Sequence, residues 1–153
     1  LMQGAETPFV SRSYQFQYNP FTHTGVYATS PLNDNWTVSN GIVLGSDNFV
    51  GSPARATYIG QLKWAPPEGK TGVLFNVVAT DPTYDAKEEF PFYNYYGIVL
   101  THKFTDKLTY VLDGSFSHIS DAPLPDGRTG TATWYGASQY LIYNHTDKLV
   151  STA

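Results

Sequence analysis

The sequence contains no cysteine, few charged residues and no long apolar run, and each of these absences argues against a class of protein. Without cysteine, the chain has neither a disulfide framework nor a thiolate metal site. Charged residues make up 14% of the 153 residues, against about 25% in an average soluble domain. The formal net charge of -4 gives no basic footprint for nucleic acid. The best apolar stretch, 72–79, is interrupted by Asn76 and falls short of the roughly 20 residues of a membrane helix. A membrane interpretation must therefore be a β-barrel interpretation.

Aromatic residues, in contrast, are abundant, at 16% of the chain, and Tyr alone accounts for 12 residues. This composition suits a barrel whose outer surface meets lipid and whose rims carry Tyr and Trp. Glycine and proline are scattered, and no helical i, i+3, i+4, i+7 apolar stripe is sustained. We therefore expect an all-β chain, a single segment over 1–153 without an internal domain boundary. Strands are predicted at 23–30, 36–46, 55–64, 71–80, 94–104, 108–118, 132–144 and 148–153.

Alternation of apolar and polar residues is clearest between Leu108 and His118. Every second residue from Leu108 to Phe116 is apolar or glycine, whereas the residues between them are mainly polar. Residues 55–64 follow the same pattern. Because side chains of a strand point alternately to its two faces, such strands have one apolar and one polar face. Residues 131–144 carry aromatic side chains on both faces, and the pattern leaves their inner and outer faces unassigned.

Short and long connections alternate along the predicted strands. The tight turns are 31–35, 65–70, 105–107 and 146–148, and the longer connections are 46–54, 81–93 and 119–130. A barrel that crosses a membrane produces this alternation, with short periplasmic turns and longer external loops. The turn sequence Thr105-Asp106-Lys107-Leu108 recurs at 146–149, with a looser version at 33–36. We expect the Asp side chain to close each turn through its own hydrogen bond. These connections predict an antiparallel up-and-down transmembrane β-barrel with about eight strands present.

Several stretches of the chain match one known family of proteins. They read PFVSRSY at 8–14, PFTHTGV at 20–26, WTVSNGIV at 36–43 with DNF at 47–49, YGIVLTH at 96–102 and WYG at 134–136. Together they resemble the putative β-barrel porin-2 family of bacterial outer-membrane proteins. The resemblance implies a pore in the bacterial outer membrane, with membrane lipid and small solutes or ions as partners, and it brings no catalytic residue or cofactor. The resemblance leaves undecided whether the protein forms homo-oligomers. Complete members are longer and the last predicted strand stops mid-pattern, so we expect an internal segment of a larger barrel.

The polar residues of the alternating strands are candidates for lining a pore. An Arg or Lys that faces lipid at mid-membrane costs about 2–4 kcal/mol, so such residues should face the lumen or lie at a rim. Lys63 and Lys103 lie beside predicted tight turns, where their long side chains can reach the interface. Arg55 and Asp113 are therefore the stronger candidates for the lumen. The full set of pore-lining candidates is Arg55, Gln61, Lys63, Asn76, Lys103 and Asp113.

A second set of candidates is aromatic. Trp36 and Trp64 flank tight turns, at the level where a periplasmic belt of aromatic residues would lie. The alternative is that these side chains form the core of a water-soluble barrel, and the alternating connections favour the membrane girdle. The girdle candidates are Trp36, Trp64, Tyr95, Tyr96, Trp134, Tyr140 and Tyr143.

The densest carboxylate cluster lies in the predicted connection 81–93. Asp81, Asp85, Glu88 and Glu89 supply oxygen ligands of the kind that calcium takes, but without the spacing of a defined calcium loop. We interpret this segment as a solvated external loop, with a bound cation as the weaker alternative. The four histidines are scattered without a pair at ligand spacing. No metal site and no cofactor are therefore predicted.

Three functions fit these observations to different degrees. The first is a passive outer-membrane channel, whose selectivity comes from lumen charges rather than from chemistry. The second is a soluble lipocalin- or avidin-like barrel that holds one small ligand, which requires an apolar interior and a polar exterior. The third, a fragment of a carbohydrate-active enzyme, needs a convergent carboxylate pair on strands, and only Asp113 lies in the middle of a strand. We favour the channel, then the binding barrel, and predict that the protein is not an enzyme.

Overall fold

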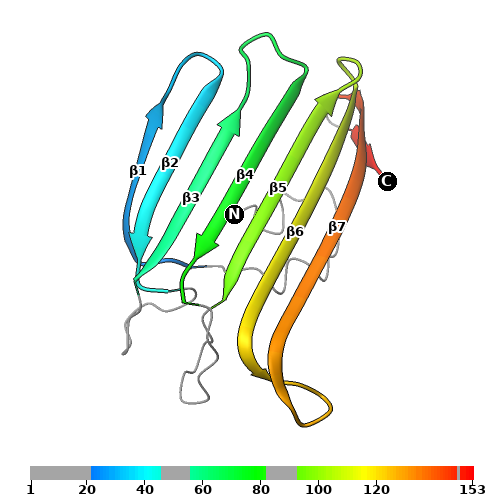
Figure 1. The fold of residues 1–153 in the computed structure, drawn as a ribbon. Helices are drawn as coiled ribbons and strands as arrows, with labels where there is room; N and C mark the ends of the chain where they lie inside the picture. Colours follow the sequence, from blue (N-terminus) through cyan, green and yellow to red (C-terminus); the bar gives the residue numbers. More distant parts are fainter. Residues whose placement is uncertain (1–21, 46–55, 82–92, 148) are drawn as a thin grey trace.

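The described residues of the chain form eight β-strands (Figure 1). The computed structural model describes residues 22–45, 56–81, 93–147 and 149–153. Within these ranges no helix is long and apolar enough to span a bilayer. The strands are β1 (Gly25–Pro31), β2 (Trp36–Val43), β3 (Thr57–Trp64), β4 (Thr71–Ala79), β5 (Asn94–Lys103), β6 (Leu108–Pro123), β7 (Thr129–Thr146) and β8 (Leu149–Thr152).

The strands form one sheet in which each strand pairs with the next along the chain. The order is β1-β2-β3-β4-β5-β6-β7-β8, and every pair is antiparallel. The sheet is open, with β1 and β8 at its two edges. This all-β, up-and-down arrangement confirms the predicted fold class. Asn40-Gly41, a dipeptide that also favours hairpin turns, lies inside β2 as expected.

The hairpin of β6 and β7 is longer than the sequence pattern predicted. The strands reach Pro123 and restart at Thr129, so the long connection predicted at 119–130 is wrong. A β-bulge between Ile119 and Ala122, with Asp121 at a φ of 55°, allows pairing to continue past the break in alternation. The true turn is short, closed by a 2.8 Å hydrogen bond from the Leu124 amide to the Arg128 carbonyl. In Figure 1 this hairpin extends past the ends of the neighbouring strands.

The repeated turns are closed by their first residue. The Thr105 hydroxyl accepts hydrogen bonds from the amides of Lys107 and Leu108, at 3.2 and 3.0 Å. The Thr146 hydroxyl accepts one from Leu149 at 3.1 Å, and in the looser version Asn33 accepts from residues 35 and 36. The expectation that the Asp carboxylate closes each turn is therefore wrong, because the side chain of the residue before it accepts the hydrogen bonds from the turn amides.

The register of the ladder assigns every strand residue to one of two faces. Directly paired residues of an antiparallel ladder lie on the same face, so the pairs can be followed from β1 to β8. What we call the polar face carries most of the Ser, Thr, amide and charged side chains of the strands, together with aliphatic and aromatic ones, and the apolar face carries mainly aliphatic and aromatic side chains. Typical members of the polar face are Thr29, Ser39, Gln61, Asn76, Asp113 and Ser117; those of the apolar face are Ile42, Leu62, Phe75, Ile98, Leu112 and Leu141.

Solvent exposure on the two faces is the reverse of that in a water-soluble protein. On the apolar face, Ile42 is 56% exposed and Ile98 43%. On the polar face, Ser39 is 4% exposed and Ser117 1%, and Val43 and Val78 of the same face are buried beside them. A soluble sheet buries its apolar face and leaves the polar one in water. The sheet therefore presents its apolar side outward and encloses its polar side.

Candidate functional site

The polar face carries a continuous row of uncharged residues across seven strands. The register joins these residues as direct neighbours, and we call them the central row: Thr29, Ser39, Gln61, Asn76, Gly97, Ser115 and Gly136. Two hydrogen bonds link neighbours within it. The hydroxyls of Thr29 and Ser39 lie 2.9 Å apart, and the Gln61 amide nitrogen donates to Asn76 Oδ1 at 2.9 Å. These bonds fix the side chains across the strands rather than along them.

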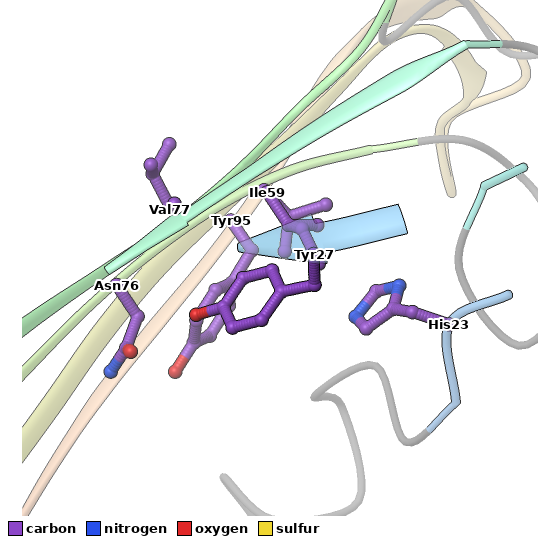
Figure 2. A pocket seen from close by; sticks show the side chains of 8 residues that line it. His23, Tyr27, Ile59, Asn76, Val77 and Tyr95 are labelled. Atoms are coloured by element: carbon purple, nitrogen blue, oxygen red, sulfur yellow. The ribbon is translucent and has the colours of Figure 1, made fainter. Parts of the chain in front are cut away.

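A hollow opens on the polar face beside the central row, and Asn76 is the member of that row that lines it. Its volume is about 490 Å³, and the side chains around it include His23, Tyr27, Ile59, Asn76 and Tyr95. Tyr27 lies on β1 and Tyr95 on β5, and in a flat sheet strands four apart are roughly 19 Å apart. Both line one hollow, so the sheet curves toward its polar face. Figure 2 shows Asn76, Tyr27 and Tyr95 on one side of the strands and Val77 on the other.

Two glycines allow the tyrosine rings of the hollow to lie against the sheet. A Cβ added to Gly97 would meet the hydroxyl and ring of Tyr95. A Cβ added to Gly41, the cross-strand partner of Tyr27, would meet Tyr27 Cδ2 at 2.8 Å. Aromatic rings often cover strand glycines in this way, which restores the packing that a missing side chain loses. Both rings are therefore held flat on the polar face.

The hydrogen bond of His23, at the edge of the hollow, defines the tautomer of its neutral ring. Its Nδ1 lies 3.2 Å from the carbonyl oxygen of Gly45. Because a carbonyl only accepts, Nδ1 must carry the proton of this bond. In the neutral ring, Nε2 is then an acceptor.

The described members of the predicted pore-lining set all lie on the polar face. Gln61 and Asn76 belong to the central row, and Lys63 lies in one register row with Asp113, through Leu74 and Val99. Lys63 and Lys103 are exposed beside tight turns, and Asp113 is half-buried. Its carboxylate interacts electrostatically with the hydroxyl of Tyr95. Arg55 lies outside the described residues. Their role in lining a pore stays a prediction.

The predicted aromatic girdle is divided between the two faces. Four of its members are on the apolar face: Trp36, Trp64, Tyr96 and Tyr143. The other three are on the polar face, because Tyr95 and Trp134 both pair with Ser117, and Tyr140 pairs with Val111. The seven candidates therefore do not share one face, and the aromatic girdle stays a prediction. The sequence pattern did not show this division, because β7 carries aromatic residues on both faces.

Aromatic side chains gather at both ends of the apolar face. Near the tight turns, the rings of Trp36 and Trp64 are 6.4 Å apart, and those of His102 and Phe104 are 4.8 Å apart. Near the longer connections, Phe116 is 6.3 Å from Tyr96 and 6.0 Å from His118. Sequence reasoning did not include Tyr58, Tyr110, Phe116 and Tyr135 in the girdle, although they share the apolar face. The alternation within 108–118 already gave the signal for Tyr110 and Phe116.

The described residues offer no assembled metal site. They contain no group of three or more His, Cys, Asp or Glu side chains able to hold an ion. Of the acidic loop, only Asp81 is described, and Asp85, Glu88 and Glu89 lie outside the described residues. At the β6–β7 turn, Arg128 Nη2 lies 2.6 Å from Asp126 Oδ2. Hydrogen bonds from Arg128 hold the pKa of the Asp126 carboxyl below its ordinary value.

Comparison with known proteins identifies a family. A family model described as putative beta-barrel porin-2, OmpL-like, matches residues 2–153, which include all eight strands. No curated protein and no solved structure matches the chain. The family match agrees with the resemblance in the sequence and with the antiparallel all-β sheet.

Proposed function

Because this chain belongs to the putative β-barrel porin-2, OmpL-like family, we propose that its sheet forms the wall of an outer-membrane channel. Small solutes or ions pass through this channel passively. The apolar face contacts lipid, and the polar face lines the water-filled lumen. Membrane lipid and the passing solute are then the partners of the protein, and its place is the bacterial outer membrane.

The observation that carries this proposal is the reversed exposure of the two faces. A strand wall in a bilayer needs apolar side chains outward and can have polar ones inward. The exposed side chains of the apolar face, with Ile42 at 56% and Phe75 at 43% exposed, meet the first need. The central row on the enclosed face meets the second. The aromatic clusters at the two ends of the apolar face match the two membrane interfaces.

Passage through such a wall needs no chemical step. Selectivity in a channel comes from its width and from the charges and hydrogen-bonding groups that line it. The polar face offers both kinds of group, with Asp113 and Lys63 in one row and uncharged side chains in the central row. The proposal therefore assigns no nucleophile, general base or cofactor to these residues.

The soluble binding barrel is the weaker alternative. It requires an apolar interior that holds the ligand and a polar exterior that meets water. The described strands have an apolar exterior instead, with Ile42 and Ile98 exposed, and their enclosed face buries Ser39 and Ser117 beside Val43 and Val78. This arrangement favours the channel.

Cell fractionation and conductance measurements test the proposal. We expect the protein in the outer-membrane fraction, with an electrophoretic mobility that changes on boiling. We expect the purified protein to produce stepwise ion currents in planar bilayers. A protein that is soluble without detergent, keeps one mobility and produces no current would contradict the channel.

A further inference from the structure

We propose that the hollow on the polar face binds an uncharged, hydroxyl-rich solute of the sugar class during its passage. This inference rests on the proposed channel function and adds the class of solute. The hollow lies beside the central row, which contributes Asn76 to it, on the face assigned to the lumen. Its volume of about 490 Å³ is within the range of about 300–1,000 Å³ that is usual for small-molecule sites.

The described lining of the hollow selects against anions. Its described lining comprises His23, two tyrosines, an asparagine, a glycine and three aliphatic residues. Apart from the titratable His23, none of these side chains is charged at neutral pH. An anion would lose hydration here without gaining an opposite charge, and the Asp113 carboxylate that acts on Tyr95 would repel it. The lining therefore favours a neutral solute over an anion.

The two aromatic rings give the hollow its apolar surface. The Tyr27 and Tyr95 rings lie against Gly41 and Gly97, so their positions are set by the sheet. Such rings present broad apolar surface with a polar hydroxyl at one end. A sugar ring has apolar C–H surface and hydroxyls around its rim, which complements this combination. Figure 2 shows both tyrosines on the same side of the strands as Asn76.

The polar groups of the hollow include both donors and acceptors. Asn76 accepts the bond from Gln61 through Oδ1 at 2.9 Å, which orients its amide and leaves its NH₂ group as a donor. The bond from His23 Nδ1 to Gly45 leaves Nε2 as the acceptor. A hydroxyl group both donates and accepts, so a solute with several hydroxyls can use both groups. A site fixed by strand pairing and side-chain bonds also loses little freedom on binding.

Calorimetric titration of the folded protein with maltose tests the inference directly. The protein is kept in lauryldimethylamine oxide, because sugar detergents would compete, and folding is checked by circular dichroism. We expect saturable maltose binding, and no comparable binding of the charged sugar acid gluconate. Asn76→Ala and Tyr95→Ala should each weaken maltose binding by about tenfold, a change of about 1.4 kcal/mol.

Tyr140→Ala is the matched control for Tyr95→Ala. Tyr140 is a tyrosine of the same face, on β7, and is not among the residues that line the hollow. Its removal should leave maltose affinity within twofold of wild type. Tyr95→Phe keeps the ring and should retain more affinity than Tyr95→Ala.

Conductance measured on the same samples separates the two proposals. Ion currents without saturable maltose binding would overturn the sugar site and leave the channel standing. Equal loss of affinity in Tyr140→Ala and Tyr95→Ala, or tighter binding of gluconate than of maltose, would also overturn the site. Maltose binding that is sensitive to Asn76 and Tyr95, in a protein that gives no current, would support a binding hollow and contradict the channel.

Discussion

Asp113 is the carboxylate with the clearest place on the polar face. It is half-buried in the middle of β6 and shares a register row with Lys63. The two opposite charges come from strands that are three steps apart, and the curvature of the sheet brings such strands toward a common space. In a row that carries one negative and one positive side chain, the preference for cations or anions depends on the balance of the two charges. Removing one charge should therefore change the ion selectivity measurably.

Asp113→Asn should shift the ion selectivity of the channel toward anions. A unit charge about 7 Å from a passing ion contributes about 0.6 kcal/mol in water, and its removal disfavours a cation and favours an anion by that amount each, so the ratio of cation to anion permeability should fall by about sevenfold. The reversal potential in planar bilayers under a KCl gradient measures this ratio. Asp126→Asn is the matched control, because Asp126 is at the exposed β6–β7 turn and paired with Arg128. Equal reversal potentials for wild type and Asp113→Asn would remove Asp113 from the lumen.

Gly41 and Gly114 should respond differently to the same substitution. A Cβ at Gly41 would lie 2.5 Å from the Val26 carbonyl oxygen, a backbone atom that cannot move aside. A Cβ at Gly114 would lie 3.4 Å from Ile98 Cγ2, an ordinary contact. Gly41→Ala should therefore lower the free energy of unfolding by about 1–3 kcal/mol. Gly114→Ala should leave it unchanged or raise it by up to about 1 kcal/mol. Urea unfolding in lipid vesicles measures both, and similar values for the two variants would contradict the register of β1 and β2.

At the scale of elements, the repeated turns show which of their residues closes the turn. Thr105→Ala removes the acceptor of the Lys107 and Leu108 amides. The β5–β6 turn is exposed, so water replaces part of the loss, and we expect a decrease of about 0.5–1.5 kcal/mol in the free energy of unfolding. Asp106→Ala, the neighbouring control, should change it by less than about 0.5 kcal/mol. The same urea titration separates the two, and a larger effect from Asp106→Ala would restore the carboxylate as the group that closes the turn.

Most elements were predictable because their alternation is local. The strands before β6 follow their predicted bounds within three residues, because each has its own period of two and ends at turn residues. The extension of β6 was not predictable, since Asp121 breaks the alternation and only pairing with β7 carries the strand past it. The faces of β7 were undecided for a related reason. Trp134 and Tyr135 are both aromatic, and only the pairing of Trp134 with Ser117 places it on the polar face.

At the scale of the whole molecule, the hollow depends on information that no single strand contains. Gln61 and Asn76 were candidates for the polar lining because each lies at a polar position of an apparent strand. Their mutual hydrogen bond depends on the β3–β4 register. Tyr27 and Tyr95 are far apart in sequence and meet at one hollow only because the sheet curves. Sequence alternation can assign a face, but it does not give the curvature that brings β1 toward β5.

The two faces can be tested together through the three tryptophans of the chain. Trp36 and Trp64 lie on the apolar face, beside tight turns, and Trp134 lies on the polar face. We therefore expect lipids brominated near their headgroup end to quench the fluorescence of Trp36 and Trp64, because interfacial indoles lie at that depth. Acrylamide in water should quench Trp134 more strongly than the brominated lipid does. Each measurement uses a variant that keeps one tryptophan and has phenylalanine at the other two positions.

A common response of all three tryptophans to brominated lipid would contradict the assignment of faces. If Trp134 alone were quenched by lipid, the polar face would be the outer one, and the sheet would be reversed relative to the proposal. If the brominated lipid quenched none of the three tryptophans and acrylamide quenched all of them, the sheet would be surrounded by water. The expected pattern of two lipid-quenched and one water-quenched tryptophan requires both the register of the strands and an apolar face that meets the bilayer. It therefore tests the feature on which the proposed channel depends, independently of any solute.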